Sequence, residues 1–215
     1  MVTVNHRFTE VFERRGIKQS SYNQILTDLG QAVVVPTLGS IVPNWLLVIP
    51  KLPALNFKTW QSGQINDAMA LLRVASNQLG VEEKKLLWFE HGAATAGSTT
   101  GCGVDYAHLH MIIDPDFTLE EFRSAVFHLS QNDWHNVDSS SPYAKISSQD
   151  DYYVFGQGQD AYASDFTHSL GSQFFRRVIA NLVRKENEWD YKKFPHLEYV
   201  DVSVRNFSMK LEDAA

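Results

Sequence analysis

The sequence predicts an α+β fold in which helices pack on an antiparallel β-sheet. Three observations lead to this fold class. Short runs rich in β-branched and aromatic residues alternate with amphipathic stretches of helical period, neighbouring strands follow one another early in the chain, and no βαβ unit recurs. With 215 residues, 44% of them hydrophobic, the chain can bury a core of its own. We expect one domain over residues 1–215, with a C-terminal extension over about 140–215.

The first half of the chain is expected to hold short helices, a strand hairpin and a longer helix. In order, these are helices over 8–15 and 21–29, strands over 32–36 and 44–51, and a helix over 64–79. A glycine follows each of the three helical stretches, as is common at helix ends. The two strands are bounded by Gly and Pro, and the loop between them predicts a hairpin with a long connection.

The second half continues with strands and helices in mixed order. These are strands over 84–91 and 104–113, a helix over 118–131, strands over 151–157 and 161–164, and a helix over 172–187, before a polar and aromatic tail. Thr118 is placed to cap its helix, and Leu119, Phe122, Val126 and Leu129 are expected to share one face of that helix. Adjacent strands with helices laid over them favour an antiparallel sheet.

Composition and charge exclude several classes of protein. The net charge is −6, the pI is about 5.7 and no run of Lys or Arg occurs, which argues against binding to a nucleic-acid polymer or an anionic membrane. A single cysteine excludes an internal disulfide framework and fits a reducing compartment. The N-terminal stretch is charged where a signal peptide is apolar, and no run of about 18 apolar residues occurs. We expect a cytoplasmic protein.

Two histidines stand two residues apart in the apolar run VDYAHLHMII. Because side chains alternate along a strand, Tyr106, His108 and His110 are expected on one face and the intervening residues on the other. One face would belong to the core, and the other would be polar and open to a cleft. The turn over Gly101–Gly103 has small or absent side chains, so its backbone N–H groups are suited to hold an anion such as phosphate.

Three interpretations of this pair stay open from the residues alone. A neutral imidazole held at Nδ1 can attack phosphorus through Nε2, while the second histidine donates a proton to the departing group or holds the non-bridging oxygens. His-x-His can also begin a zinc or iron site, for which His91, His128, His135 or Asp105 would have to supply a third ligand. The third interpretation is structural, with both rings hydrogen-bonded inside a sheet. Cys102 is expected to be a small loop residue rather than a thiol nucleophile.

Four blocks of sequence, taken together, resemble the histidine-triad superfamily. The run DYAHLHMII is similar to its signature, His-x-His-x-His followed by two apolar residues. VVVPTLGSIVPNWLLVIPK is similar to its N-terminal hairpin, whose second strand ends in Pro-Lys. WFEHG followed by GCGVDYAHLH, and SQFFRRVIA with WDY, resemble a bacterial group within the superfamily. The resemblance covers roughly residues 20 to 192.

The resemblance implies a site on these blocks. His108 corresponds to the middle histidine of the triad, which is the nucleophile toward a nucleotide α-phosphate, and His110 corresponds to the third. Tyr106 stands where the first histidine would be, and its phenol can still donate a hydrogen bond to phosphate. Thr37 takes the place of an acid that in many members binds the ribose hydroxyls. Lys51, which ends the second hairpin strand, is also expected to bind the substrate.

The remaining implied contacts come from the other blocks. His91 ends the strand before the variable loop and is expected to line the site. Gln173 and Arg176, near the start of a helix, are expected to reach the phosphates. Gly101, Cys102 and Gly103 complete the predicted substrate-binding residues.

These observations lead to one expected function and two alternatives. We expect a cytoplasmic nucleotide hydrolase or nucleotidyltransferase that acts at the α-phosphate of a nucleoside phosphate conjugate through a nucleotidyl-histidine on His108. The substrate would be a nucleotide or dinucleotide, no metal or other cofactor is expected, and the superfamily resemblance implies a homodimer. The first alternative is a catalytically weakened nucleotide-binding or regulatory module. The second is a metal-dependent hydrolase that uses His108 and His110.

Overall fold

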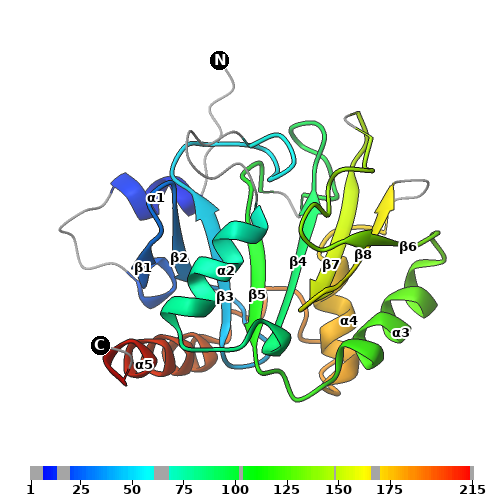
Figure 1. The fold of residues 1–215 in the computed structure, drawn as a ribbon. Helices are drawn as coiled ribbons and strands as arrows, with labels where there is room; N and C mark the ends of the chain where they lie inside the picture. Colours follow the sequence, from blue (N-terminus) through cyan, green and yellow to red (C-terminus); the bar gives the residue numbers. More distant parts are fainter. Residues whose placement is uncertain are drawn as a thin grey trace.

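An eight-stranded antiparallel sheet forms the centre of the protein (Figure 1). The computed structural model describes residues 7–13, 20–60, 68–101, 104–147, 149–165 and 170–213. The strands are β1 (Thr27–Asp28), β2 (Ala32–Pro36), β3 (Trp45–Pro50), β4 (Leu86–Gly92), β5 (Leu109–Ile113), β6 (His135–Asp138), β7 (Tyr152–Gln157) and β8 (Asp160–Asp165). Their order across the sheet is β1-β2-β3-β5-β4-β7-β8-β6. The sequence-based prediction of an α+β fold with an antiparallel sheet is confirmed.

Helices cover both faces of this sheet. They are α1 (Arg7–Glu13), α2 (Ala68–Gln78), α3 (Leu119–Ser130), α4 (Phe174–Leu182) and α5 (Leu197–Asp213), with single 3₁₀ turns η1 (Ser21–Asn23) and η2 (Glu83–Lys85). In Figure 1, α2 crosses in front of β3 and β5, and α5 runs along one end of the sheet. None of the helices in the described ranges is long and apolar enough to cross a membrane.

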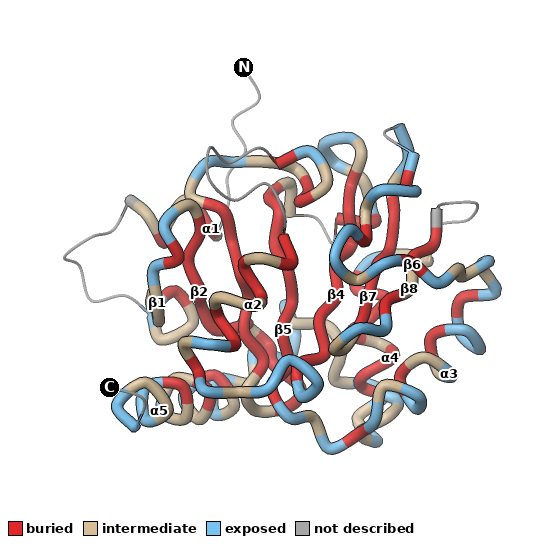
Figure 2. Tube along the Cα trace, in the orientation of Figure 1, coloured by how far each residue is buried: buried red, intermediate tan, exposed pale blue. Residues whose placement is uncertain are grey.

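The two faces of the central strands belong to different clusters of buried side chains. Leu46, Val48, Leu109 and Met111 pack with α2 on one face. On the opposite face, one cluster forms under α3 and α4 and a second forms under α1. Almost every residue of β2 to β5 is therefore buried, as the red strands of Figure 2 show.

The expected hairpin and the expected alternation along the histidine strand are both present. β2 and β3 pair antiparallel from Ala32↔Pro50 to Pro36↔Leu46. Ala107 lies in the core cluster under α2, whereas Tyr106 packs in the cluster under α1 on the other face. The second face is less polar than expected, because helices and aromatic rings cover much of it, but His108 and His110 do line a cavity there.

Four sequence-based assignments of secondary structure need correction. The stretch 21–29 is not a helix: η1 ends at Asn23 and β1 then pairs with β2. The strand expected over 104–113 begins only at Leu109. The tail contains the helix α5, and β6 was not predicted at all.

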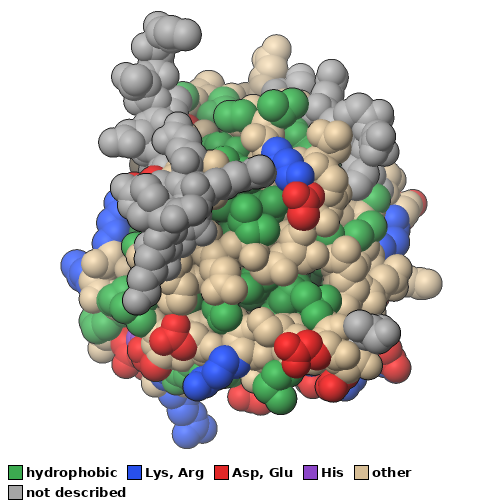
Figure 3. Space-filling view, turned by 90° about the vertical axis from the view of Figure 1, so that its left-hand side faces the viewer, with side chains coloured by type: hydrophobic (Ala, Val, Ile, Leu, Met, Phe, Trp, Pro, Cys, Tyr) green, Lys and Arg blue, Asp and Glu red, His purple; other side chains and the backbone are tan. Residues whose placement is uncertain are grey.

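Charged side chains are dispersed over the visible surface. Figure 3 shows the side of the molecule at the left of Figure 1, where basic and acidic side chains stand among hydrophobic and polar ones outside the grey atoms. This distribution agrees with the sequence, in which Lys and Arg do not cluster.

Candidate active site

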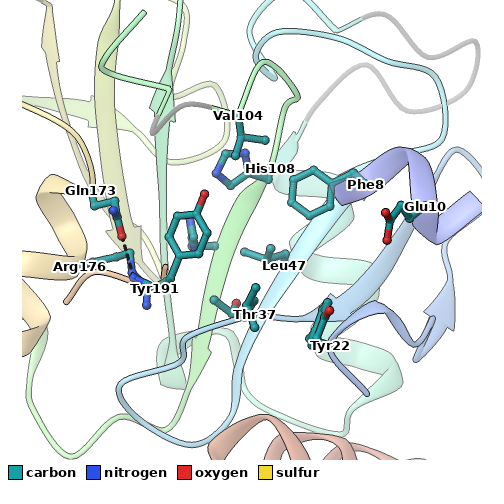
Figure 4. A pocket seen from close by; sticks show the side chains of 12 residues that line it. Phe8, Glu10, Tyr22, Thr37, Leu47, Val104, His108, Gln173, Arg176 and Tyr191 are labelled. Carbon is teal, nitrogen blue, oxygen red and sulfur yellow. Dashed lines mark hydrogen bonds between the residues drawn. The ribbon is translucent and has the colours of Figure 1, made fainter. Parts of the chain in front are cut away.

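A cavity of about 270 Å³ opens on the second face of the sheet, between the cluster under α1 and the cluster under α4. Its lining residues are Phe8, Glu10, Tyr22, Thr37, Leu38, Leu47, Val104, His108, His110, Gln173, Arg176 and Tyr191. Figure 4 shows His108 and Leu47 in the middle, with Gln173, Arg176 and Tyr191 to one side. The volume is near the lower end of the range of about 300–1,000 Å³ that small-molecule sites occupy.

His108 presents a nitrogen lone pair in this cavity. Its Nδ1 lies 2.7 Å from the backbone carbonyl oxygen of Tyr106. A carbonyl only accepts hydrogen bonds, so Nδ1 is the protonated nitrogen and Nε2 keeps the lone pair. The ring is 8% exposed and lies 5.6 Å from the ring of Phe8 between centroids. The geometry is that of an imidazole prepared to act as a nucleophile or base through Nε2.

His110 has the opposite tautomer. The indole Nε1 of Trp45 donates a hydrogen bond to Nδ1 of His110 over 2.9 Å. Because an indole nitrogen only donates, Nδ1 keeps its lone pair and the neutral ring carries its proton on Nε2. The rings of His108 and His110 are 5.1 Å apart. The two histidines therefore place one acceptor nitrogen and one N–H donor at the same cavity.

His91 contacts the ring of His110 but does not line the cavity. Its Nε2 accepts a hydrogen bond from the backbone N–H of Phe175 in the first turn of α4, over 3.2 Å. Its ring meets that of His110 edge-on, with centroids 6.0 Å apart. Burial, and then the positive charges that His108 and Arg176 can carry, hold the pKa of His91 well below its usual value, so this ring is neutral.

Arg176 and Gln173, which were predicted to bind phosphates, both line the cavity, and both also form hydrogen bonds within the protein. The guanidinium of Arg176 donates through Nε to the carbonyl oxygen of Trp189 over 2.9 Å and through a terminal nitrogen to the carbonyl oxygen of Gly39. The side-chain oxygen of Gln173 accepts from the backbone N–H of Tyr191 over 3.3 Å (Figure 4). These bonds fix the segment that places Tyr191 on the cavity wall.

The far half of the cavity is aromatic, and Glu10 and Thr37 add a carboxylate and a hydroxyl to its rings. Phe8 and Glu10 come from α1, and Tyr22 comes from η1 (Figure 4). Thr37 follows β2 and is 2% exposed. Its hydroxyl oxygen is buried and makes no hydrogen bond to the described residues. A ligand in this half would meet flat apolar walls, a hydroxyl and a carboxylate.

Several predicted site residues lie elsewhere. The ammonium group of Lys51 forms an ion pair with Asp28, 2.7 Å from a carboxylate oxygen, and does not line the cavity. The phenol of Tyr106 donates a hydrogen bond to the carbonyl oxygen of Pro50 over 2.8 Å. Its side chain thus links the segment before β5 to the end of β3 and does not line the cavity. Gly101 is buried and is not a lining residue either. Cys102 and Gly103 lie outside the described residues.

Sequence reasoning missed four of the lining side chains with functional groups or rings. They are Phe8, Glu10, Tyr22 and Tyr191. A signal existed only for Tyr191, because the WDY segment was among the blocks that resembled the superfamily. The other three come from the N-terminal part of the chain, where no motif marks them.

The described residues contain no group of three or more His, Cys, Asp or Glu side chains arranged to hold a metal ion. The metal-dependent hypothesis therefore lacks a third ligand in this part of the chain. No protein-family model matches the chain, and the search of curated proteins gives no significant match.

Proposed function

We propose that the protein is a nucleotide hydrolase or nucleotidyltransferase that acts at the α-phosphate of a nucleoside phosphate conjugate. The observation that supports it most is the hydrogen bond from Nδ1 of His108 to the Tyr106 carbonyl oxygen, which leaves the Nε2 lone pair in the cavity. The resemblance to the histidine-triad superfamily supports the same assignment. His108 is the proposed nucleophile and His110 the proposed donor to phosphate.

The first chemical step forms a covalent intermediate. The Nε2 lone pair of His108 attacks the α-phosphorus, an N–P bond forms, and the leaving oxygen departs with the electrons of its P–O bond. The imidazole gains positive charge in this step and retains its Nδ1 proton. The carbonyl oxygen of Tyr106 accepts that proton's hydrogen bond at 2.7 Å and stabilises the charge as it develops.

The second step releases the nucleotide. A water molecule attacks the phosphorus, loses a proton to solvent, and returns the N–P bonding electrons to Nε2 of His108. If the hydroxyl or phosphate oxygen of a second substrate attacks instead, the same intermediate gives a transferase. Access of that second substrate decides between the two reactions.

The cavity suits one nucleotide. Its volume is about 270 Å³, His108 lies in the middle, and aromatic walls stand at the far end, where Phe8 and Tyr22 can pack on a base. The hydroxyl of Thr37 is buried and has no hydrogen-bond partner among the described residues, so it can accept or donate one hydrogen bond to a sugar hydroxyl. Gln173 and Arg176, on the other side of His108, lie where phosphate oxygens can be bound.

A labelling experiment tests the covalent step. The protein is incubated in EDTA with a dinucleoside polyphosphate that is radiolabelled at the α-phosphate. We expect an acid-labile, base-stable label on the wild type and none on His108→Ala, which should also lose turnover by about 10³-fold or more. His128→Ala removes an exposed histidine on α3 and is the matched control.

The other outcomes select the alternatives. Nucleotide binding without label or turnover would replace the proposal with the binding-module hypothesis. Activity that EDTA abolishes and zinc restores would replace it with the metal-dependent hypothesis. A cytoplasmic homodimer also belongs to the proposal, and the mass of the particle in solution, measured by light scattering, tests the dimer.

A further inference from the structure

The hydrogen bond between Trp45 and His110 joins two rings that are both held in place. Trp45 is fully buried, the guanidinium of Arg176 lies 4.9 Å over its face, and its edge meets Phe89 with centroids 5.7 Å apart. His110 is stacked on Phe89, with centroids 4.5 Å apart and planes within 13°. Neither ring can turn without losing these contacts. A cation over the indole face also makes its N–H a stronger donor, because it draws electrons from the ring.

This geometry bears on whether His110 can give away a proton. A neutral imidazole that loses its Nε2 proton becomes an imidazolate, which is a far stronger base than a phosphate leaving group. To act as a general acid, His110 would first have to be an imidazolium with a second proton on Nδ1. That proton would face the Trp45 N–H across 2.9 Å, so a hydrogen bond would become a repulsive contact between two donors.

The charges around His110 disfavour the imidazolium as well. The ring is 5% exposed, His108 lies 5.1 Å away between centroids and His91 6.0 Å away. The guanidinium of Arg176 lies over the face of Trp45, 4.9 Å from the centre of that ring. A buried cation at His110 would therefore stand near one fixed positive charge and the imidazole that becomes positive on attack.

We propose that Trp45 is a positioning residue that keeps His110 as an Nε2–H hydrogen-bond donor to the phosphoryl oxygens and prevents it from protonating the leaving group. The kinetic consequence rests on the proposed function, whereas the tautomer does not. His108 forms the N–P bond, the leaving oxygen takes the P–O electron pair, and His110 keeps its proton throughout. The site thus favours leaving groups that are stable as anions, such as phosphates, over alcohols and amines.

Nuclear magnetic resonance tests the tautomer directly. In ¹⁵N-labelled protein, long-range ¹H–¹⁵N spectra distinguish a protonated ring nitrogen from one with a lone pair, and His110→Gln assigns the signals. We expect His110 to be protonated on Nε2 and His108 on Nδ1, so that two histidines two residues apart show opposite patterns. A proton on Nδ1 of His110 in the wild type would overturn the proposal.

Replacing the donor tests the role of Trp45. In Trp45→Phe, His110 should change from a single tautomer to a mixture of the two neutral forms. Trp88→Phe is the matched control, because Trp88 is equally buried, lies on the opposite face in β4 and makes no hydrogen bond through Nε1 to the described residues. If Trp45→Phe does not fold, β-(3-benzothienyl)alanine at position 45 keeps the shape and removes the donor. An unchanged His110 pattern in the folded variant would refute the role.

A leaving-group series tests the kinetic consequence. Aryl esters of a nucleoside 5′-phosphate, made with phenols of graded acidity, are compared with an alkyl ester. We expect wild-type rates to fall steeply as the leaving group becomes more basic, and His110→Ala to lower every rate by the same factor of about 10²–10³. A loss in His110→Ala that is largest for the alkyl ester would show general-acid catalysis and overturn the proposal. If no nucleotide is turned over, the proposed function fails and the tautomer spectra still decide the role of Trp45.

Discussion

At the scale of single residues, adjacent side chains of β4 serve opposite faces of the sheet. His91 supports the cavity, whereas Glu90 is 1% exposed and accepts hydrogen bonds from the backbone N–H of Phe57 and the phenol of Tyr152, both over 2.8 Å. Burial raises the pKa of Glu90 from 4.5 to about 7, although both hydrogen bonds oppose the rise. A carboxyl group thus holds the segment around Phe57 to the sheet.

Glu90 should make stability depend on pH. Since its pKa is higher in the folded than in the unfolded protein, its contribution is fully present below pH 4.5 and is lost as the pH rises through about 7. We expect the free energy of unfolding of the wild type, relative to Glu90→Gln, to fall by on the order of 3 kcal/mol between pH 4.5 and 8. Urea unfolding at several pH values measures this difference.

The control for this experiment is Glu186→Gln, which removes the same charge from an exposed position. A difference between wild type and Glu90→Gln that stays constant with pH, after this correction, would contradict the assignment.

The protonation of the two cavity histidines shows what the sequence could and could not predict about single residues. The motif predicted that a bond at Nδ1 would prepare His108 for attack, and its partner is a carbonyl only two residues away. The partner of His110 is Trp45, 65 residues away on another strand. No spacing in the sequence indicates a hydrogen bond between strands, so the tautomer of His110 could not be predicted.

At the scale of elements, local sequence signals correctly predicted features such as helix caps. Structure that depends on pairing between distant segments could not be predicted from them. Thr118 caps α3, as the sequence indicated, and forms a capping box there with Glu121. In contrast, Leu26 and Leu29 donate backbone hydrogen bonds to Val34 and Ala32, so pairing with β2 overrides the helical pattern of 21–29. The helix α5 was missed because only a few of its side chains are buried among many polar ones. In the sequence, a helix with so few apolar residues is hard to distinguish from a polar tail without regular structure.

The capping box of α3 should contribute measurably to stability. The hydroxyl of Thr118 accepts from the backbone N–H of Glu121 over 3.2 Å, and the Glu121 carboxylate accepts from the backbone N–H of Thr118 over 2.8 Å. We expect Thr118→Ala to lower the free energy of unfolding by about 1 kcal/mol in urea, because it leaves a helix N–H without its acceptor. Thr118→Ser keeps the acceptor and should stay close to the wild type. Equal losses in both variants would mean that the methyl group, not the cap, matters.

At the scale of the whole molecule, the cavity joins parts of the chain that are far apart in the sequence. Phe8 lies on one side of it and Tyr191 on the other, with Leu47 of β3 between them, and β5 contributes His110 to the lining. The sequence predicted an antiparallel sheet and the placement of His108 and His110 on one face of the sheet, because both predictions depend on local patterns. It did not predict the aromatic walls, because they depend on how α1 and the segment around Tyr191 pack against the sheet.

A nucleotide that bridges these parts should stabilise the whole protein. At a concentration about 100 times its Kd, a nucleoside monophosphate is expected to add about 2.7 kcal/mol to the free energy of unfolding, because it binds only the folded chain. Thermal unfolding with the nucleotide, the nucleoside or inorganic phosphate measures the shift, which should be largest for the nucleotide. An equal shift with phosphate alone would mean that the aromatic half of the cavity binds no base.

The cavity wall formed by Tyr191 also sets an order of events during synthesis. The strands that carry both histidines are made well before the segment around Tyr191, which Gln173 and Arg176 hold in place. A nascent chain on the ribosome therefore contains His108 and His110 before it contains the residues that enclose the cavity beside them. On the proposed function, chains that end before Gln173 are expected to keep most of the sheet and both histidines but to bind no nucleotide.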